Sequence, residues 1–338
     1  MLKGNRSIKS LALGLLVTIA LLAIPATALA TRDGSSLAAV SFDCTAVAEI
    51  PQAECEALVS LYNSTGGPNW TNSTDWLVTN TPCTWFGVTC AGGHVSDLNL
   101  RGNQLTGSIP LELSGLASLL SLDLALNQLT GAIPPGLSGL ARPLNLSYNQ
   151  LTGSIPSELG GLASLQELDL AYNQVAGSIP SELGNLSSLQ KLYLWHNQST
   201  GVIPPELGGL TTLQVLYLNN NQLSGSIPPE LGGLDSLRTL ILRSNGLTGP
   251  IPSELGGLAN LTGLVLSQNQ LTGTIPAELG NLANLAEFNI SINQLTGTIP
   301  PELGNLANLG YLFVYQNLLD VPLPETLTDL NLISFRYR

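Results

Sequence analysis

An asparagine recurs along most of the chain at nearly constant spacing, and this repeat constrains the fold more than any other feature. Every interval is 24 residues except one of 22. The positions are Asn103, Asn127, Asn149, Asn173, Asn197, Asn221, Asn245, Asn269, Asn293 and Asn317. Short units that repeat at a fixed period cannot bury their apolar faces alone, so they stack on their neighbours. The sequence therefore predicts an elongated α/β solenoid, which presents a long surface more often than a catalytic pocket.

One unit, from Leu165 to Val175, indicates what each position does. Three leucines follow the two-residue period of a half-buried strand and are expected to point inward: Leu165, Leu168 and Leu170. The residues between and after them are expected to face solvent: Glu167, Asp169 and Ala171. Asn173 follows where the chain turns away from the strand. Its amide is expected to bond backbone groups that the turn leaves unpaired inside the stack.

The second half of the same unit predicts a short helical turn. Glycine and proline interrupt the chain at Gly177 and Pro180, and Ile179, Leu183 and Leu186 have the spacing of one apolar helical face. We expect these three side chains to close the core on the side opposite the strand.

These residues resemble a known repeat. The pattern L-x-x-L-x-L-x-x-N-x-L-x-G-x-I-P-x-x-L-G-x-L runs from Val95 to Asn317 and resembles the plant-type leucine-rich repeat. The segment from Cys83 to Cys90 resembles the family's amino-terminal cap. The resemblance implies a right-handed superhelix with parallel strands on the concave face and short helical turns on the convex side. It also implies extracellular recognition of proteins, peptides or glycans. We expect a cap over residues 31–94, ten repeats over 95–317 and a partial terminal repeat over 318–338.

The amino-terminal segment has the pattern of a secretory signal peptide over residues 1–30. Basic residues precede an apolar run from Leu11 to Ile24, and Ala28-Leu29-Ala30 forms a small-residue cleavage site. The alternative is an uncleaved membrane anchor. No later apolar stretch of membrane length occurs in the sequence. The expected location is therefore extracellular or at the cell surface.

The charge balance argues against nucleic acid as a partner. The formal net charge is −12, and it becomes −15 without residues 1–30, because that segment holds three basic residues and no acid. A chain this acidic repels polyanions, and no basic cluster offsets the repulsion.

Four cysteines precede the first repeat, namely Cys44, Cys55, Cys83 and Cys90. An even number in a secreted chain predicts two disulfides, and the spacing alone allows three pairings. A zinc site is the rival interpretation, but it lacks C-x-x-C spacing. Because Cys83 and Cys90 match the family cap, the resemblance implies that they pair with each other and that Cys44 pairs with Cys55. Between the two pairs, Glu54 to Tyr62 is expected to form an amphipathic helix.

The aromatic residues are the main functional signal. Six of the eight tyrosines fall at solvent-facing positions of the expected strands: Tyr148, Tyr172, Tyr193, Tyr217, Tyr311 and Tyr315. Trp195, His196 and Phe313 join them. Neighbouring strands lie about 4.8 Å apart, so the sequence predicts a continuous aromatic patch across repeats three to six. Tyrosine and tryptophan concentrate at recognition surfaces. The alternative is that tyrosine serves there only as a good strand residue, stabilised by cross-strand pairs.

No catalytic constellation is found in the sequence. His94 and His196 are about four repeats apart, no nucleophile or phosphate-loop motif occurs, and Glu167 and Asp169 lie on an open face. We expect no enzyme, cofactor or metal site.

The sequence therefore predicts a recognition module that binds an extracellular protein or peptide, or a glycan. The expected binding residues are Tyr148, Glu167, Asp169, Tyr172, Lys191, Tyr193, Trp195, His196, Tyr217 and Asn219. Asn219 belongs to the expected polar rim. Two alternatives remain open: an inhibitor of a secreted hydrolase, by likeness to polygalacturonase inhibitors, and a surface or adhesive spacer without a specific ligand. The oligomeric state is left open.

Overall fold

The computed structural model describes residues 42–137, 143–320, 324–327, 330 and 332–336. The chain divides into two units, Met1–Ala39 and Val40–Arg338, and only the second contains described residues. The signal peptide expected over residues 1–30 lies outside them. Within the described ranges, no helix has both the length and the apolar character needed to cross a membrane.

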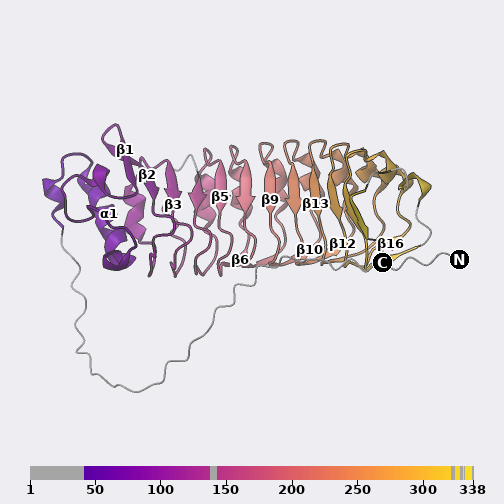
Figure 1. Ribbon diagram of the computed structural model, residues 1–338, viewed down its shortest axis with the longest axis horizontal. Helices are drawn as coiled ribbons and strands as arrows, with labels where there is room; N and C mark the ends of the chain where they lie inside the picture. Colours follow the sequence, from indigo (N-terminus) through magenta and orange to yellow (C-terminus); the bar gives the residue numbers. More distant parts are fainter. Residues whose placement is uncertain (1–41, 138–142, 321–323, 328–329, 331, 337–338) are drawn as a thin grey trace, which may run out of the picture. The chain divides into compact units, whose positions relative to one another are not determined.

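Twelve strands form one sheet in which each repeat adds one strand (Figure 1). All neighbours pair in parallel except β1 and β2, which form an antiparallel hairpin. The strands in sheet order are β1 (Val88–Ala91), β2 (His94–Asn99), β3 (Ser121–Asp123), β4 (Leu144–Asn145), β5 (Glu167–Asp169), β7 (Lys191–Tyr193), β9 (Val215–Tyr217), β11 (Thr239–Ile241), β13 (Gly263–Val265), β15 (Glu287–Asn289), β17 (Tyr311–Phe313) and β19 (Ser334–Arg336). The register advances by one repeat per strand, so Leu168 pairs with Leu192 and Leu192 pairs with Leu216.

Among the described residues, three short 3₁₀ helices lie in the cap and the others lie between successive strands of the twelve-stranded sheet. They are η1 (Cys44–Ala46), η2 (Gly67–Asn69), η3 (Pro82–Thr84), η4 (Leu111–Gly115), η5 (Ser157–Gly161), η6 (Ser181–Asn185), η7 (Pro205–Gly209), η8 (Pro229–Gly233), η9 (Ser253–Gly257), η10 (Ala277–Asn281), η11 (Pro301–Asn305) and η12 (Glu325–Leu327). From η4 to η11 a proline caps each helix, and its fixed φ suits the first turn. Successive turns pack so closely that a Cβ at Gly208 would overlap the backbone oxygen of Glu230 in the next turn, so only glycine fits there.

A second sheet runs along the edge of the stack, and the sequence analysis did not predict it. It contains β6 (Ala176–Ser178), β8 (Gln198–Gly201), β10 (Gln222–Gly225), β12 (Gly246–Gly249) and β14 (Gln270–Leu271), and a separate pair of strands, β16 (Thr296–Gly297) and β18 (Leu318–Leu319), follows. Its strands pair in parallel, and Figure 1 shows β6, β10, β12 and β16 along one edge. These strands lie in the Q-L-T-G segment, or in its variants such as Q-V-A-G, Q-S-T-G and G-L-T-G, that directly follows a ladder asparagine; β18 lies in L-L-D-V at the same place.

The interior is filled as the repeat pattern predicts. Leu165, Leu168 and Leu170 are fully buried, and Leu183 and Leu186 reach the same core from η6. The side-chain oxygen of Asn173 accepts a hydrogen bond from the backbone N–H of Leu151 at 3.0 Å. Its amide nitrogen donates to the backbone oxygens of residues 146 and 170 at 3.0 and 3.1 Å. Each repeat is therefore joined to the one before it through its asparagine.

The cap covers the first repeat with an α-helix, α1 (Gln52–Ser64), which is longer at both ends than the predicted segment. Disulfides join Cys44 to Cys55 and Cys83 to Cys90, as the resemblance implies. Glu54 is almost fully buried on α1, and its carboxylate accepts a hydrogen bond from the backbone N–H of Val95 at 2.7 Å. This bond ties the cap to β2. The predicted class, a leucine-rich solenoid with parallel strands and short helical turns, is confirmed.

Candidate functional site

The candidate site lies on the solvent-facing side of the twelve-stranded sheet, which we call the strand face. Three positions per repeat border it: the residues on either side of the central leucine of the strand, and the residue two positions after the strand end. The third of these is buried in several repeats, as at Ala125, Ser147 and Ala171. A fourth position follows in the turn, where φ is positive; it is occupied by Tyr148 (φ 55°), Tyr172 (φ 52°) and His196 (φ 53°). These three side chains therefore leave the backbone from a left-handed turn, which is uncommon for residues of their size.

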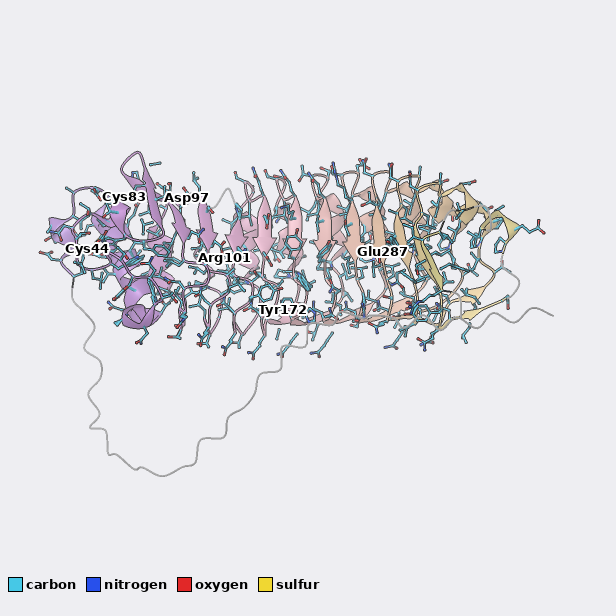
Figure 2. The ribbon with its side chains drawn as sticks, in the orientation of Figure 1. Cys44, Cys83, Asp97, Arg101, Tyr172 and Glu287 are labelled. Atoms are coloured by element: carbon cyan, nitrogen blue, oxygen red, sulfur yellow. A yellow bond between two sulfur atoms is a disulfide. The ribbon has the colours of Figure 1, made fainter. Side chains whose placement is uncertain are left out.

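Four rings form a cluster at these turns, which we call the aromatic stack. Tyr172 stacks on Tyr148 on one side and on His196 on the other, each with ring centroids 4.3 Å apart. Trp195 meets Tyr172 edge to face at 4.7 Å. Tyr148 is 42% exposed, so the stack presents ring surface to solvent. Figure 2 shows Tyr172 beside the strands in the middle of the stack of repeats.

Tyr193 and Tyr217 form a second group, the tyrosine pair. They end β7 and β9, lie opposite each other in the sheet register, and meet edge to face at 5.3 Å. The ring contacts of repeats three to six therefore fall into two neighbouring groups, one at the strand ends and one centred on the turns.

The aromatic residues near the carboxyl end are separate. Tyr311 and Phe313 lie on β17, four strands beyond β9, with ring centroids 6.5 Å apart. Tyr311 is 40% exposed. It therefore offers an exposed tyrosine on the same face but away from the two groups.

Two carboxylates flank the rings, and their surroundings differ. Glu167 is paired with Lys191 on the next strand, with Oε2 and Nζ 3.0 Å apart. Asp169 accepts a hydrogen bond from the backbone N–H of Ala171 at 3.0 Å. Burial raises the pKa of the Asp169 carboxyl above its usual value, and the nearby Glu167 raises it further. The Ala171 bond and the Ser147 hydroxyl act in the opposite direction.

Burial also shifts the pKa values of two of the ring side chains, Tyr193 and His196. Burial, with the Glu167, Tyr217 and Asp169 charges behind it, raises the pKa of Tyr193 to about 12. Burial lowers the pKa of His196, so its imidazole is neutral at neutral pH. Its Nε2 then accepts a hydrogen bond from the Asn220 amide at 3.0 Å. The surface is aromatic, neutral at its rings and negative at Asp169.

Two residues differ from their expected exposure. Ala171 is only 1% exposed, although the alternation predicted a solvent-facing position, because the chain has already entered the turn there. Asn219 is only 9% exposed and is therefore not part of an open rim. Its Oδ1 is buried and finds no hydrogen-bond partner among the described residues. A buried acceptor without a donor is uncommon in a folded protein.

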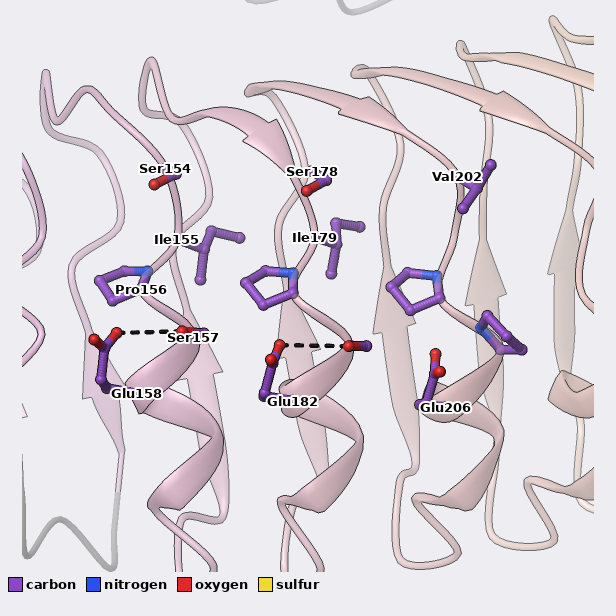
Figure 3. A pocket seen from close by; sticks show the side chains of 14 residues that line it. Ser154, Ile155, Pro156, Ser157, Glu158, Ser178, Ile179, Glu182, Val202 and Glu206 are labelled. Carbon is purple, nitrogen blue, oxygen red and sulfur yellow. Dashed lines mark hydrogen bonds between the residues drawn. The ribbon is translucent and has the colours of Figure 1, made fainter.

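An open groove of about 690 Å³ lies elsewhere, beside the 3₁₀ helices (Figure 3). Prolines, serines and glutamates from three successive repeats line it, and Ser157 and Ser181 each bond the neighbouring glutamate at 3.4 Å. All three glutamates, Glu158, Glu182 and Glu206, are exposed to solvent. Their position in the first turn of a helix already accounts for them.

The second sheet presents a surface that the sequence analysis overlooked. Its outward residues are uncharged and repeat from strand to strand, as in Gln198 and Thr200 on β8, then Gln222 and Ser224 on β10. All four are exposed. The signal was present in the period-two pattern of the Q-L-T-G segments, which alternates exposed polar residues with a buried leucine.

Family models match most of the repeat region. Leucine rich repeat models match residues 187–247 and residues 94–116, 118–140, 144–162, 164–186, 260–282 and 284–306. A leucine rich repeat N-terminal domain model matches residues 51–91.

Similar proteins come mostly from plants. The leucine-rich repeat receptor protein kinase EMS1 of Arabidopsis thaliana is 39% identical over 82 residues, which is 24% of this chain and 7% of that protein. The ectodomain of the Arabidopsis receptor kinase HAESA, solved with the peptide hormone IDA and the co-receptor SERK1, superimposes with a TM-score of 0.66. It is 36% identical, over 81% of this chain and 51% of that one. A plant ice-binding protein superimposes with a TM-score of 0.67 at 27% identity, over 82% of this chain and 90% of that one. The chain spans between 4% and 13% of the length of the curated plant receptor kinases it matches.

Proposed function

Because this chain belongs to the leucine-rich repeat family, with the family's cysteine-containing amino-terminal cap, we propose that it is a non-catalytic module that binds an extracellular peptide or protein segment. The binding surface is the strand face at the aromatic stack and the tyrosine pair. HAESA, which was solved with a peptide hormone, has the same repeat architecture. The likeness covers only the repeat region of the receptor kinases, so it supports binding and carries nothing about kinase activity.

One observation carries the proposal: the rings on the strand face are not needed by the core. The leucines of β7 and β9 are fully buried without them, and Tyr193 and Tyr217 stand on the opposite side of each strand. Rings held by their neighbours lose little side-chain entropy on binding, because stacking already restricts them. A rigid, half-exposed aromatic surface beside a carboxylate suits a peptide that supplies apolar and polar groups in alternation.

The test is affinity measured after ring removal. Peptides are selected from a displayed library on the immobilised protein, and their Kd is measured for Tyr193→Ala, Trp195→Ala and Tyr217→Ala. Loss of an anchor of about 2 kcal/mol raises Kd roughly 30-fold. Tyr311→Ala is the matched control, since it removes an exposed tyrosine from the same face away from both ring groups. Equal affinity for all four variants contradicts the proposal, provided that circular dichroism shows unchanged folding.

A second candidate, ice binding, is favoured by the second sheet. Its strands expose rows of glutamine, threonine and serine at the spacing of a parallel sheet, about 4.8 Å. In six repeats we compared the five residues that follow the ladder asparagine, beginning with 174–178 and ending with 294–298. None of these segments contains a charged residue. A regular uncharged surface can hold bound water in a repeating arrangement, and the plant ice-binding protein shares this fold over 90% of its own chain.

Inhibition of ice recrystallisation tests this candidate. Thr248→Lys with Thr272→Lys places one charge on β12 and one directly after β14, and is expected to abolish the inhibition. Ala259→Lys with Ala283→Lys adds the same charge at exposed sites away from that sheet and is expected to leave it unchanged. A wild-type protein without any inhibition overturns this candidate and leaves the peptide proposal standing.

A further inference from the structure

Asp169 lies between the two ring groups of the strand face. In the sheet register it stands opposite Asn145 on one side and Tyr193 on the other. Its charge acts on the hydroxyl groups of both Tyr148 and Tyr193, one from each ring group. Ala171 and Ser147, the nearest residues of the following turns, are small and buried. The carboxylate therefore stands beside Tyr193 in the sheet and within electrostatic range of Tyr148.

Within the described ranges the Asp169 carboxylate forms no direct ion pair, although the charge of the more distant Arg101 acts on it. Two other acids of the strand face do form ion pairs: Glu167 with Lys191 at 3.0 Å, and Asp123 with Arg101 at 3.7 Å. A half-buried negative charge that forms no direct ion pair is unfavourable, because burial removes part of its hydration.

The fold does not require a charge at this position. The equivalent residue of three other repeats is an asparagine, and it makes the same bond to the backbone N–H two residues later. The distances are 3.2 Å for Asn99, 3.1 Å for Asn145 and 3.1 Å for Asn289, against 3.0 Å for Asp169. The hydrogen bond accounts for an Asp or an Asn here, and the negative charge is left without a local role.

A buried acceptor that finds no donor within the described ranges lies two repeats further along, after β9. Asn219 occupies the position of Trp195 in the next repeat, and its Oδ1 is buried without a donor in the described part of the chain. Such an acceptor is uncommon in a folded protein and keeps an unused capacity to accept a hydrogen bond. Asp169 and Asn219 belong to the two repeats on either side of the repeat that holds Trp195.

We propose that this surface selects a basic side chain, arginine or lysine, of a peptide or protein ligand, with its cationic group on the Asp169 carboxylate between the rings of Tyr148, Tyr193 and Trp195. The inference rests on the proposed function and names its specificity. A guanidinium bonds a carboxylate through two parallel N–H groups and stacks on aromatic rings. Arginine is therefore preferred over lysine. The net charge of −12 also draws basic ligands toward the chain.

Pools of short peptides test the proposal. In each pool one position is fixed as Arg, Lys, Gln or Glu, and the remaining positions are mixed. Retention of each pool is measured on the immobilised wild type, on Asp169→Asn and on Asp123→Asn. Asp169→Asn keeps the backbone hydrogen bond and removes only the charge. Asp123→Asn removes an equal charge from a paired site on the same face. Tyr217→Ala, measured in parallel, reports on the proposed function itself.

The expected result is a retention of the Arg pool roughly tenfold above that of the Gln pool on the wild type, which corresponds to a tenfold difference in affinity. The ratio falls to about one on Asp169→Asn and is kept on Asp123→Asn. Pools that bind through Tyr217 but show no preference for Arg or Lys overturn this inference and leave the proposed function intact. A preference that survives Asp169→Asn, or that Asp123→Asn also removes, overturns it as well. If no pool is retained by the wild type, both proposals fail.

Discussion

The strands of the first four repeats end differently from those of the next four. In β2 to β5 the last strand residue carries a short polar side chain, in the order Asn99, Asp123, Asn145 and Asp169. Each of these oxygens accepts a hydrogen bond from the backbone N–H two residues later, at 3.0 to 3.2 Å. In β7 to β13 the same position holds Tyr193, Tyr217, Ile241 and Val265, which cannot accept that bond.

Both regions nevertheless use the same asparagine ladder and the same leucine core. Asn149 in the first region and Asn221 in the second each bond three or more backbone groups of the interior. The ladder bond is therefore required in every repeat, whereas the strand-end bond is optional. Two of the four strand ends that lack this bond hold tyrosines, Tyr193 and Tyr217, and the candidate site lies across the junction of the two regions.

The largest expected effect tests the part that the two regions share. Asn149→Ala and Asn221→Ala each leave several buried backbone groups unpaired, so each is expected to lower the free energy of unfolding by about 2–4 kcal/mol. Urea denaturation measures the loss. The exposed neighbours give matched controls, Gln150→Ala and Gln222→Ala, with changes within about 0.5 kcal/mol. A much larger loss in one region than in the other would break the comparison.

The next largest effect is expected when a strand-end residue of the second region is replaced by that of the first. Tyr193→Asn gives the second region the residue of the first, and its oxygen is expected to reach the backbone N–H of Trp195. We expect the free energy of unfolding to stay within about 0.5 kcal/mol of wild type, while peptide affinity falls roughly 30-fold through loss of the ring. Ile241→Asn is the control outside the site, with affinity retained. Strong destabilisation of Tyr193→Asn would mean that the tyrosine serves the fold.

A smaller loss is expected from removing the strand-end bond in the first region. The Asn145 oxygen accepts from both the backbone N–H and the hydroxyl of Ser147, at 3.1 and 2.7 Å. Asn145→Ala is expected to lower stability by about 1 kcal/mol, the usual contribution of such bonds. Asn145→Asp, which keeps the acceptor, is expected to lose less. Equal thermal stability of the alanine variant and wild type would show that the bond contributes nothing.

The smallest effect concerns the charge at Asp169. Its pKa is raised in the folded state, so the carboxyl contributes stability below its unfolded pKa of about 3.9, and that contribution is lost as pH rises through the folded pKa. At pH 7 Asp169→Asn is therefore expected to be more stable than wild type, by less than about 1 kcal/mol because the group is partly solvated.

This gain is expected to disappear below pH 4, and thermal unfolding across pH 3 to 8 measures it. Glu167, Lys191, Tyr148, Tyr193 and Arg101 are the charged or titratable groups that surround the carboxyl. Glu167 is the other carboxyl among them, so Glu167→Gln is the control for its contribution. A gain that stays constant across this pH range would rule out the charge as its cause.

Much of the fold could be predicted because the same residue types recur at the same positions of every repeat. The inward leucines, the ladder asparagines and the helical turns each follow from a local period, and the cysteine pairing follows from the likeness of Cys83 and Cys90 to a known cap. The second sheet was missed because its strands are only two to four residues long and follow the ladder turn directly. A period of two over so few residues does not separate a strand from an extended loop.

The candidate site was predicted less completely. The sequence placed the tyrosines on the strand face, and the neighbours in the stack, Tyr148, Tyr172 and His196, follow from the 24-residue spacing. It placed Ala171 and Asn219 in solvent, where the structure buries both. The alternation of a strand was continued past the strand end, into a turn with positive φ that rotates the following side chains.

The sequence by itself determined which residues fill the interior of each repeat, since burial of leucine and pairing of the asparagine amide depend on contacts within one unit and its neighbour. Only the tertiary structure decided which polar groups on the surface find partners. Lys191 reaches Glu167 and not Asp169, and the Asn219 oxygen meets no donor among the described residues. These outcomes depend on side chains from adjacent strands, whose approach is set by the stacking of one repeat on the next and by the turn after each strand.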